Sequence, residues 1–494
     1  MTVESNKNAD MSLWIASIPV VFLMGLLGAA VILFGDSSSS GPNQISLMLA
    51  AGVGIIVGLA QGMSWNELEQ ALIDGIMLAM KACLILLMVG SLIGSWMLAG
   101  TAPAIIHLGL GVLGPDWFYP ASMIVCALVA ISIGSSWTTA ATVGLALVGI
   151  AGILGLSAPI TAGAVISGAY FGDKMSPLSD TTNLAPAMAG AELFTHIRHM
   201  FWTTGPSFLL ALVLFSSISL SQDVPSAEPG SIEATRLLLE QSFSIGIWSF
   251  FPLALLLFLA FKKVPALPTI TIGAIAGCVI AAIFQPDLAR QLGTASGAAV
   301  SDNLQLFRGL WSVVVDGFQS NTGDASLDSL LSRGGMSSML NTVWLIISAM
   351  CFGGIMEHTG ILQRIATAAL TRVRGTGSLI VTTVLTAIGM NVLAADQYIA
   401  IVLPGRMYRA EFKRRGLAPE NLSRTVEDAG TMTSALIPWN TCGAFMAATL
   451  GVPTFAYAPF AFLNIFNPII AVIYGVANIR ITKLDEIQTS AAQA

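Results

Sequence analysis

Apolar runs of about the length of a membrane-spanning helix recur along the whole chain, and they restrict its fold more than any other feature. Such a helix needs about 20 mainly apolar residues. The runs lie near residues 12–34, 45–62, 78–98, 117–134, 139–155, 158–171, 202–220, 243–261, 268–285, 339–356, 377–394, 395–405, 428–448 and 455–478. Only 10% of the residues are charged, against about 25% in a soluble domain. The sequence therefore predicts an all-α polytopic membrane protein with roughly 11–13 transmembrane helices.

Basic residues gather in particular loops, and their position predicts the orientation of the chain. They are Lys262, Lys263, Arg364, Arg372, Arg374, Arg406, Arg409, Lys413, Arg414, Arg415, Arg424, Arg480 and Lys483. The positive-inside rule places these loops in the cytoplasm. A long polar insert at 286–338 contains five aspartates and three arginines, so we expect it outside. Alternation between these marks places both termini in the cytoplasm.

A weak internal repeat relates the two halves of the chain. Residues 134–144 align with residues 389–399, and the same shift carries Asp173 onto Asp428, Ser176 onto Thr431 and Ser179 onto Ser434. The predicted topology makes the two segments cross the membrane in opposite directions. Inverted repeats with interrupted helices are typical of secondary transporters, whose binding site lies near the membrane midplane.

The repeat predicts four parts of the chain. They are a first inverted repeat at 1–200, a linker helix and external loop at 201–242, a second inverted repeat at 243–480 that carries the insert, and a cytoplasmic tail at 481–494. Stretches of the insert such as "GTASGAAVSDN" lack an apolar period. We therefore expect deletion of residues 291–330 to be tolerated.

The stretch "GAYFGDKMSPLSDTTNLAP" at 168–186 places charges inside an apolar region. Each charge at the centre of the membrane costs about 2.5 to 3.5 kcal/mol. Pro177 and Pro186 favour a broken helix, because proline removes a backbone donor and clashes with the preceding turn. A break exposes backbone carbonyls beside carboxylate, amide and hydroxyl oxygens, which are the ligands of hard cations such as Na⁺.

These oxygens define the candidate ion site. The predicted ion-binding residues are Asp173, Ser176, Ser179, Asp180, Thr182, Asn183, Asp428, Thr431, Ser434 and Asn440, with Na⁺ held at Asp173 and Asp428, one from each repeat. Further candidates for lining the site are Ser136, Thr139, Asn391 and Asp396.

Structural roles compete with these assignments. Lys174 is also expected to neutralise Asp180 or Asp173 in an internal ion pair, and Asp428 is alternatively an interfacial residue. Hydroxyl groups in membrane helices often bond to their own backbone. The five cysteines are scattered through apolar runs, which predicts neither a disulfide framework nor a zinc site, and we expect no cofactor.

The runs "GDKMSPLSDTTNLA" (172–185) and "EDAGTMTSALIPWNTCGA" (427–444) resemble the NhaC family of Na⁺/H⁺ antiporters within the ion transporter superfamily. The resemblance implies a transporter of the bacterial inner membrane, not an enzyme, with Na⁺, H⁺ and lipid as its partners and no nucleic acid. Some similar proteins exchange malate and protons for lactate and Na⁺, so an organic-anion exchanger is the alternative. Whether two copies form a homodimer stays open.

A mechanism follows from the chemistry of a shared carboxylate. An aspartate binds either a proton or a cation, so H⁺ and Na⁺ exclude each other at Asp173 and Asp428. Alternating access then exchanges them across the membrane. An intramembrane aspartyl protease also needs two aspartates, but Tyr170 replaces the first glycine of its Gly-x-Gly-Asp motif.

Overall fold

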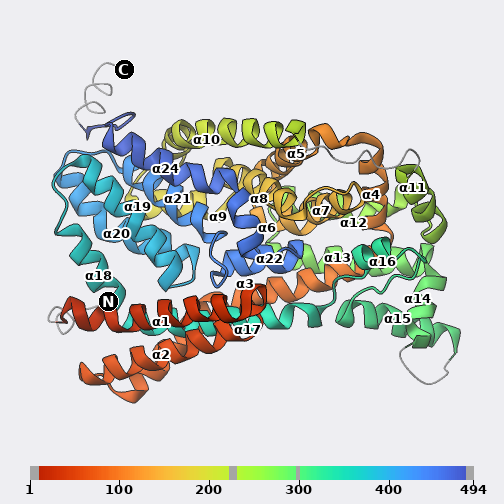
Figure 1. The fold of residues 1–494 in the computed structure, drawn as a ribbon, viewed down its shortest axis with the longest axis horizontal. Helices are drawn as coiled ribbons and strands as arrows, with labels where there is room; N and C mark the ends of the chain where they lie inside the picture. The colour runs from red at the N-terminus through yellow and green to blue at the C-terminus, as the bar shows by residue number, and fades with distance from the viewer. Residues whose placement is uncertain (1–10, 222–230, 296–300, 485–494) are drawn as a thin grey trace.

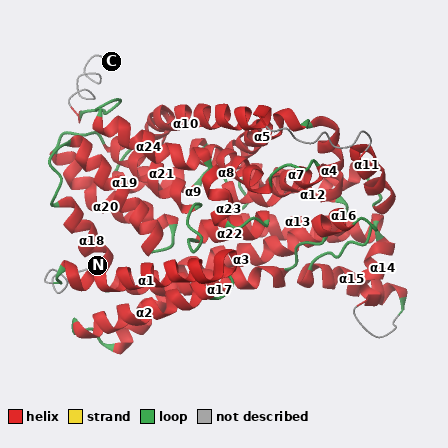
Figure 2. Cartoon of the chain, in the orientation of Figure 1, coloured by secondary structure: helices red, strands yellow, loops and turns green. Residues whose placement is uncertain are grey.

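The computed structural model describes residues 11–221, 231–295 and 301–484, and throughout these ranges the regular structure is helical (Figure 2). Nine of the described helices are long and apolar enough to cross a membrane, and eleven spans result if each of two bent pairs counts as one. The all-α polytopic class is confirmed. Residues 485–494 of the predicted cytoplasmic tail lie outside the described ranges.

The first half of the chain contains ten α-helices. They are α1 (Leu13–Phe34), α2 (Pro42–Ala60), α3 (Trp65–Leu98), α4 (Thr101–Val112), α5 (Phe118–Ile133), α6 (Ser136–Thr139), α7 (Leu145–Ile153), α8 (Ala158–Met175), α9 (Asp180–Ala189) and α10 (Leu193–Ser221). A π-helical turn at Ala140–Gly144 joins α6 to α7.

The second half follows a comparable order with additional helices. They are α11 (Ser231–Ser242), α12 (Phe251–Phe261), α13 (Ala266–Phe284), α14 (Pro286–Ala295), α15 (Asp302–Asp316), α16 (Ala325–Leu331), α17 (Leu340–His358), α18 (Ile361–Leu370), α19 (Thr376–Leu393), α20 (Gln397–Arg414), α21 (Pro419–Ser434), α22 (Thr441–Leu450), α23 (Thr454–Tyr457) and α24 (Phe462–Val476).

Matching helix ends reveal the register of the repeat. The N-caps Ser135 and Ser179 recur, at one constant interval along the chain, as the N-caps Asp396 and Asn440. The left-handed residues Gly134 and Gly190 recur at the same interval as Ala395 and Gly451.

This register differs from the one expected from the sequence. At the interval set by the helix ends, Asp173 corresponds to Ser434 and not to Asp428. Serine and threonine are so frequent in both segments that several registers match almost equally well. The pairing of Asp173 with Asp428 is therefore wrong.

Corresponding helices run antiparallel, which confirms that the repeats are inverted. Along α3, Gly75 contacts Gly354, whereas Gly94 contacts Gly335, so α17 descends where α3 ascends. Gly335 lies as far along the chain from Gly75 as Gly354 lies from Gly94. A shift by this interval therefore carries the residues of α3 in the two contacts onto Gly335 and Gly354, as a two-fold axis between the halves requires.

Helices α10 and α24 each contain an internal proline, Pro206 and Pro468, at nearly the same interval. The sequence predicted a linker helix and external loop at 201–242, and that division of the chain stays a prediction.

Two helical layers result (Figure 1). Helices α1, α2, α3 and α17 lie along one side, and α10, α19, α21 and α24 lie on the other. Within the first layer α2 packs on α17, where Gly54 meets Ile355, and α13 packs on α3, where Trp96 donates to the Gly273 carbonyl at 3.1 Å.

The insert at 286–338 contains the helices α14, α15 and α16, although no apolar period was recognised in the sequence, and the tolerance of a deletion of residues 291–330 stays a prediction. Helices α14 and α15 pack as a hairpin, and α15 lies against α3. Ser91 of α3 donates to the Val314 carbonyl at 3.1 Å, and Val313 is fully buried. The apolar positions of α15 recur with a helical period, which its glycine- and serine-rich flanks conceal.

Candidate ion-binding site

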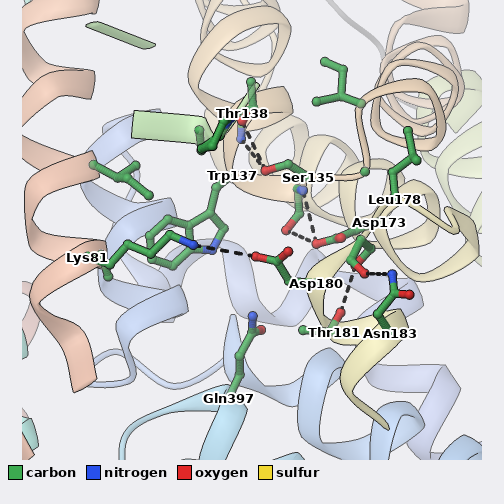
Figure 3. Close-up of a pocket in the computed structure, with 18 of the residues that line it drawn as sticks. Lys81, Ser135, Trp137, Thr138, Asp173, Leu178, Asp180, Thr181, Asn183 and Gln397 are labelled. Atoms are coloured by element: carbon green, nitrogen blue, oxygen red, sulfur yellow. Dashed lines mark hydrogen bonds and ion pairs between the residues drawn. The ribbon is translucent and has the colours of Figure 1, made fainter. Parts of the chain in front are cut away.

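A cavity of about 850 Å³ lies where the helix breaks of both halves meet (Figure 3). The N-terminal ends of α6, α9, α20 and α22 line it, together with Asp173 of α8. Helix α3 and the turn between α12 and α13 form the opposite wall. The first group carries the interrupted helices, and the second belongs to the layer formed around α3 and α17.

The breaks are built by local backbone chemistry. Gly134 (φ 74°) and Ala395 (φ 56°) each hold a left-handed conformation directly before a new helix begins. The following residue caps that helix: the Ser135 hydroxyl accepts from the Thr138 amide, and the Asp396 carboxylate accepts from the Tyr398 amide. The N-termini of α6, α9, α20 and α22 each present polar groups to the cavity.

Asp173 points into the cavity from the last turn of α8, and its side chain is almost completely buried. Its Oδ2 accepts from the Ser136 hydroxyl at 2.6 Å and from the Ser136 amide at 3.2 Å. These two donors and the N-terminus of α6 favour the carboxylate, whereas burial disfavours its charge. This balance allows the group to hold either a proton or a cation.

Asp396 is the carboxylate that the second half contributes to the same cavity. It is also nearly buried, and it accepts from the amides of Tyr398 at 2.8 Å and Ile399 at 3.1 Å. The Thr441 hydroxyl, from the start of α22, lies 3.5 Å from Oδ2. The Asp173 carboxylate thus lies at the N-terminus of α6, and Asp396 is the N-cap of α20.

Charged groups also mark the mouth of the cavity. Lys81 of α3 lies 4.0 Å from Asp180, and both side chains are largely exposed. Figure 3 shows Asp180 between Lys81 and Asp173. Lys263 lines the wall formed by the turn before α13. An exposed ion pair of this kind contributes about 0–1 kcal/mol, so Lys81 and Asp180 are free to rearrange around an ion.

The predicted site residues divide into two groups. Those that line the cavity are Ser136, Asp173, Ser179, Asp180, Asn183 and Asp396. Those that lie outside its lining are Thr139, Ser176, Thr182, Asn391, Asp428, Thr431, Ser434 and Asn440.

The structure separates the two aspartates that the sequence placed in one cage. Asp428 forms a fully buried ion pair with Lys174, and it also accepts from the Thr203 hydroxyl at 3.1 Å. Successive residues of a helix point about 100° apart, so Asp173 faces the cavity while Lys174 faces α21. The expected partners of Lys174, Asp180 and Asp173, are therefore replaced by Asp428.

Most of the predicted residues outside the cavity lining stabilise the backbone around the helix breaks. Ser176 donates to the Ile131 carbonyl at 2.8 Å and fastens the α8–α9 turn to α5. Asn391 donates to the Gly430 carbonyl at 2.6 Å, and Asn440 caps α22. Ser434 lies 3.2 Å from the Gln397 amide oxygen. These side chains position the cavity wall without reaching the cavity.

Two of the second group have other surroundings. Thr139 donates to the Ser135 carbonyl of its own helix at 2.9 Å, as the alternative role predicted. Thr431 is buried, and its hydroxyl has no hydrogen-bond partner among the described residues.

The sequence matches a known family over most of its length. The profile of the Na⁺/H⁺ antiporter family matches residues 168–479. The chain is 36% identical to the Na⁺/H⁺ antiporter NhaC of Alkalihalophilus pseudofirmus, over 90% of this chain and 91% of that protein. The chain belongs to the NhaC family of Na⁺/H⁺ antiporters. It is therefore a multi-pass membrane transporter, and its transported ions are Na⁺ and H⁺.

Other relatives carry names that include organic substrates. The chain is 32% identical to the malate-2H⁺/Na⁺-lactate antiporter of Bacillus subtilis, over 92% of this chain and 93% of that protein. It is 35% identical to the arginine/ornithine antiporter ArcD of Halobacterium salinarum, over 93% of this chain and 91% of that protein.

Among the cavity residues of this NhaC-family chain that escaped prediction from the sequence are Lys81, Lys263 and Gln397. Lys81 had a usable signal, because an ionisable residue within an apolar run is functional by default. Lys263 was assigned only to a cytoplasmic loop. Gln397 follows Asp396 and carries no signal of its own.

Proposed function

We propose that this antiporter binds Na⁺ and H⁺ alternately at Asp173, with Asp396 as the second carboxylate of the same cavity. The observation that carries the proposal is the convergence of these two buried aspartates, one from each half, on a single cavity bounded by four helix breaks. Hydroxyl, amide and carbonyl oxygens beside them suit a hard cation. A proton and Na⁺ exclude each other because each neutralises the same carboxylate.

Alternating access is the second part of the proposal. The cavity is bounded on one side by α3 and the α12–α13 turn and on the other by the interrupted helices, so relative movement of these two groups exposes it to either face. The basic turn at Lys262 and Lys263 supports a cavity that opens to the cytoplasm in this conformation. We further propose a bacterial inner-membrane location with cytoplasmic termini.

An organic-anion exchanger is the second candidate. A volume of about 850 Å³ exceeds the space that one Na⁺ needs, and Lys81 and Lys263 supply positive charge to the wall. The names of two relatives support the same class. Na⁺-dependent proton flux in buffer without any organic anion distinguishes the candidates, since an obligatory organic-anion exchanger is inactive there.

The test of the ion site is substitution of each aspartate by asparagine. We expect Asp173→Asn and Asp396→Asn to reduce Na⁺-dependent proton flux in everted vesicles to the level of vesicles without the protein. Asparagine accepts a hydrogen bond from Ser136 at position 173 and caps a helix well at position 396, so both variants retain the fold while losing the charge. Asp287→Asn, at an exposed position of α14 outside the cavity lining, is the matched control and keeps flux. Normal flux in Asp173→Asn removes this residue from the ion site.

A further inference from the structure

A second pair of titratable groups lies behind the cavity. His196 of α10 and Glu427 of α21 are both fully buried, and His196 Nε2 lies 2.7 Å from Glu427 Oε2. A carboxylate oxygen only accepts, so Nε2 carries a proton that it donates to Glu427. His196 lies one turn from the start of α10, beside the exposed Thr195, which gives the pair a short route to water.

The pair is connected to the ion site through one hydroxyl group. Thr182 Oγ1 lies 3.1 Å from Glu427 Oε1, and it lies 3.2 Å and 3.0 Å from the backbone carbonyls of Asp173 and Lys174. A threonine hydroxyl has one proton, and here three acceptors surround it. A proton on Glu427 Oε1 resolves this competition, because Glu427 then donates to Thr182 and Thr182 donates to a carbonyl.

The imidazole side of the pair offers a second place for the same proton. Ser423 Oγ lies 2.8 Å from His196 Nδ1 and 3.2 Å from the Glu420 carbonyl. When Nδ1 is bare, Ser423 donates to it. When Nδ1 carries a proton, it donates to Ser423, which then donates to the Glu420 carbonyl. One additional proton is thus accommodated with every donor matched to an acceptor.

Charged groups around His196 and Glu427 make the binding of an additional proton by this pair depend on whether Asp173 holds Na⁺. The groups that face this region are Lys174 and Asp173 from α8, His199 from α10, Glu420, Arg424 and Asp428 from α21, and Tyr474 from α24. Among the fully buried side chains of this region, the cations Lys174 and Arg424 balance the anions Asp428 and Glu427. An additional proton therefore creates a net positive charge, which an ionised Asp173 favours and Na⁺ at Asp173 opposes.

We propose that His196 and Glu427 form a second proton-binding site of the exchanger, which gains a proton from water when Asp173 releases Na⁺ and loses it to water when Na⁺ binds. The proposal rests on Asp173 as the ion site. It assigns to these two residues a proton that is carried in addition to the one that competes directly with Na⁺.

The coupling ratio tests the proposal. In proteoliposomes held at zero membrane potential, the Na⁺ gradient at which net Na⁺ flux reverses at a fixed pH gradient gives the number of protons per Na⁺, and we expect about two for the unaltered protein and about one for Glu427→Gln and for His196→Asn. Each change removes one of the two groups that share the additional proton, so we expect either variant to lose the second proton site. His199→Asn is the matched control, since His199 contacts Arg424 and the Arg480 carbonyl rather than Glu427. A ratio unchanged in both variants overturns the proposal.

A measurement on the unaltered protein covers the case in which the variants do not fold. Purified protein in detergent is mixed with Na⁺, and the protons released per Na⁺ bound are counted with a pH indicator. The proposal requires a value of about two, and a value of about one contradicts it. Neither experiment uses Asp173→Asn, so failure of the second proton site is distinguishable from failure of Asp173 as the ion site.

Discussion

Lys174 and Asp428 show how adjacent residues acquire different roles when a membrane helix is interrupted. Asp173 faces the cavity, and Lys174, the next residue, is fully buried against Asp428 and also donates to the Asn467 side chain at 2.7 Å. Removal of one partner from a buried ion pair leaves an uncompensated charge, whereas replacement of both by uncharged groups is much less harmful. The pair therefore stabilises the contact between α8, α21 and α24, and both residues lie outside the cavity lining.

This role predicts a specific pattern of stability. Asp428→Asn alone is expected to destabilise the protein by about 3–5 kcal/mol because Lys174 remains charged and buried. The double variant Lys174→Met with Asp428→Asn is expected to recover most of the lost thermal stability in detergent, measured by fluorescence-detected size exclusion after heating. Equal loss of stability in the single and double variants would contradict the assignment.

Of the two aspartates that the sequence placed in one ion site, Asp173 lines the cavity and Asp428 lies outside its lining. Asp173 stands out because a charge within an apolar run beside prolines has few structural explanations. Asp428 was chosen through an alignment that paired it with Asp173, and its position opposite Lys174 depends on the packing of α8 against α21. Asp396 was expected to line the site, and the structure places it in the lining of the cavity that also contains Asp173.

At the scale of elements, the ends of the interrupted helices form the wall of the candidate ion site. Gly134 adopts φ 74° before α6, and a Cβ built there would lie 2.7 Å from the Leu178 backbone carbon in the α8–α9 turn. Its counterpart Ala395 already carries a Cβ at φ 56°. The two halves thus use the same left-handed break, but only the first requires glycine for a close approach.

Gly134→Ala is therefore expected to disturb the ion site, and Ala395→Gly is its natural control. The left-handed conformation costs about 1–2 kcal/mol with a Cβ, and the Leu178 contact forces the α8–α9 turn away from α6. We expect Gly134→Ala to raise the Na⁺ concentration for half-maximal flux about tenfold, whereas Ala395→Gly keeps it unchanged. Equal Na⁺ dependence in the two variants would show that the geometry of the break does not control the site.

Glycine and proline made these breaks partly predictable from the sequence. Pro177 and the polar residues around it predicted the interruption between α8 and α9, because proline and charges are both costly in a regular membrane helix. The break at Ala395 carries no glycine, so its equivalence to Gly134 emerges only from backbone angles. The insert was misjudged for a related reason: glycine- and serine-rich flanks concealed the helical period of α15.

At the scale of the whole molecule, a two-fold relation between the halves joins α3, α15 and α17. Gly94 of α3 approaches the Val313 carbonyl of the insert and the start of the segment that leads into α17, and Gly354 approaches the Ala71 carbonyl of α3. These two glycines occupy equivalent positions in the two halves. Both allow backbones to pack more closely than any side chain permits, as is common where membrane helices cross.

Gly94→Val and Gly354→Val are accordingly expected to have matching effects. A Cβ at Gly94 would lie 3.2 Å from the Gly335 amide nitrogen, so valine there forces α3 away from the insert and the segment before α17. A Cβ at Gly354 would lie 2.9 Å from the Gly75 Cα, so valine there forces α17 away from α3. Overpacking of this kind costs about 1–3 kcal/mol or more, and we expect both variants to lower the midpoint of thermal unfolding in detergent and to reduce Na⁺-dependent proton flux. Gly52→Val in α2 is the control, because no heavy atom lies within 4 Å of its added Cβ. If Gly52→Val proves as harmful as the other two, or if only one of the two crossing glycines is sensitive, the packing of the halves around a two-fold axis is not what stabilises the transporter.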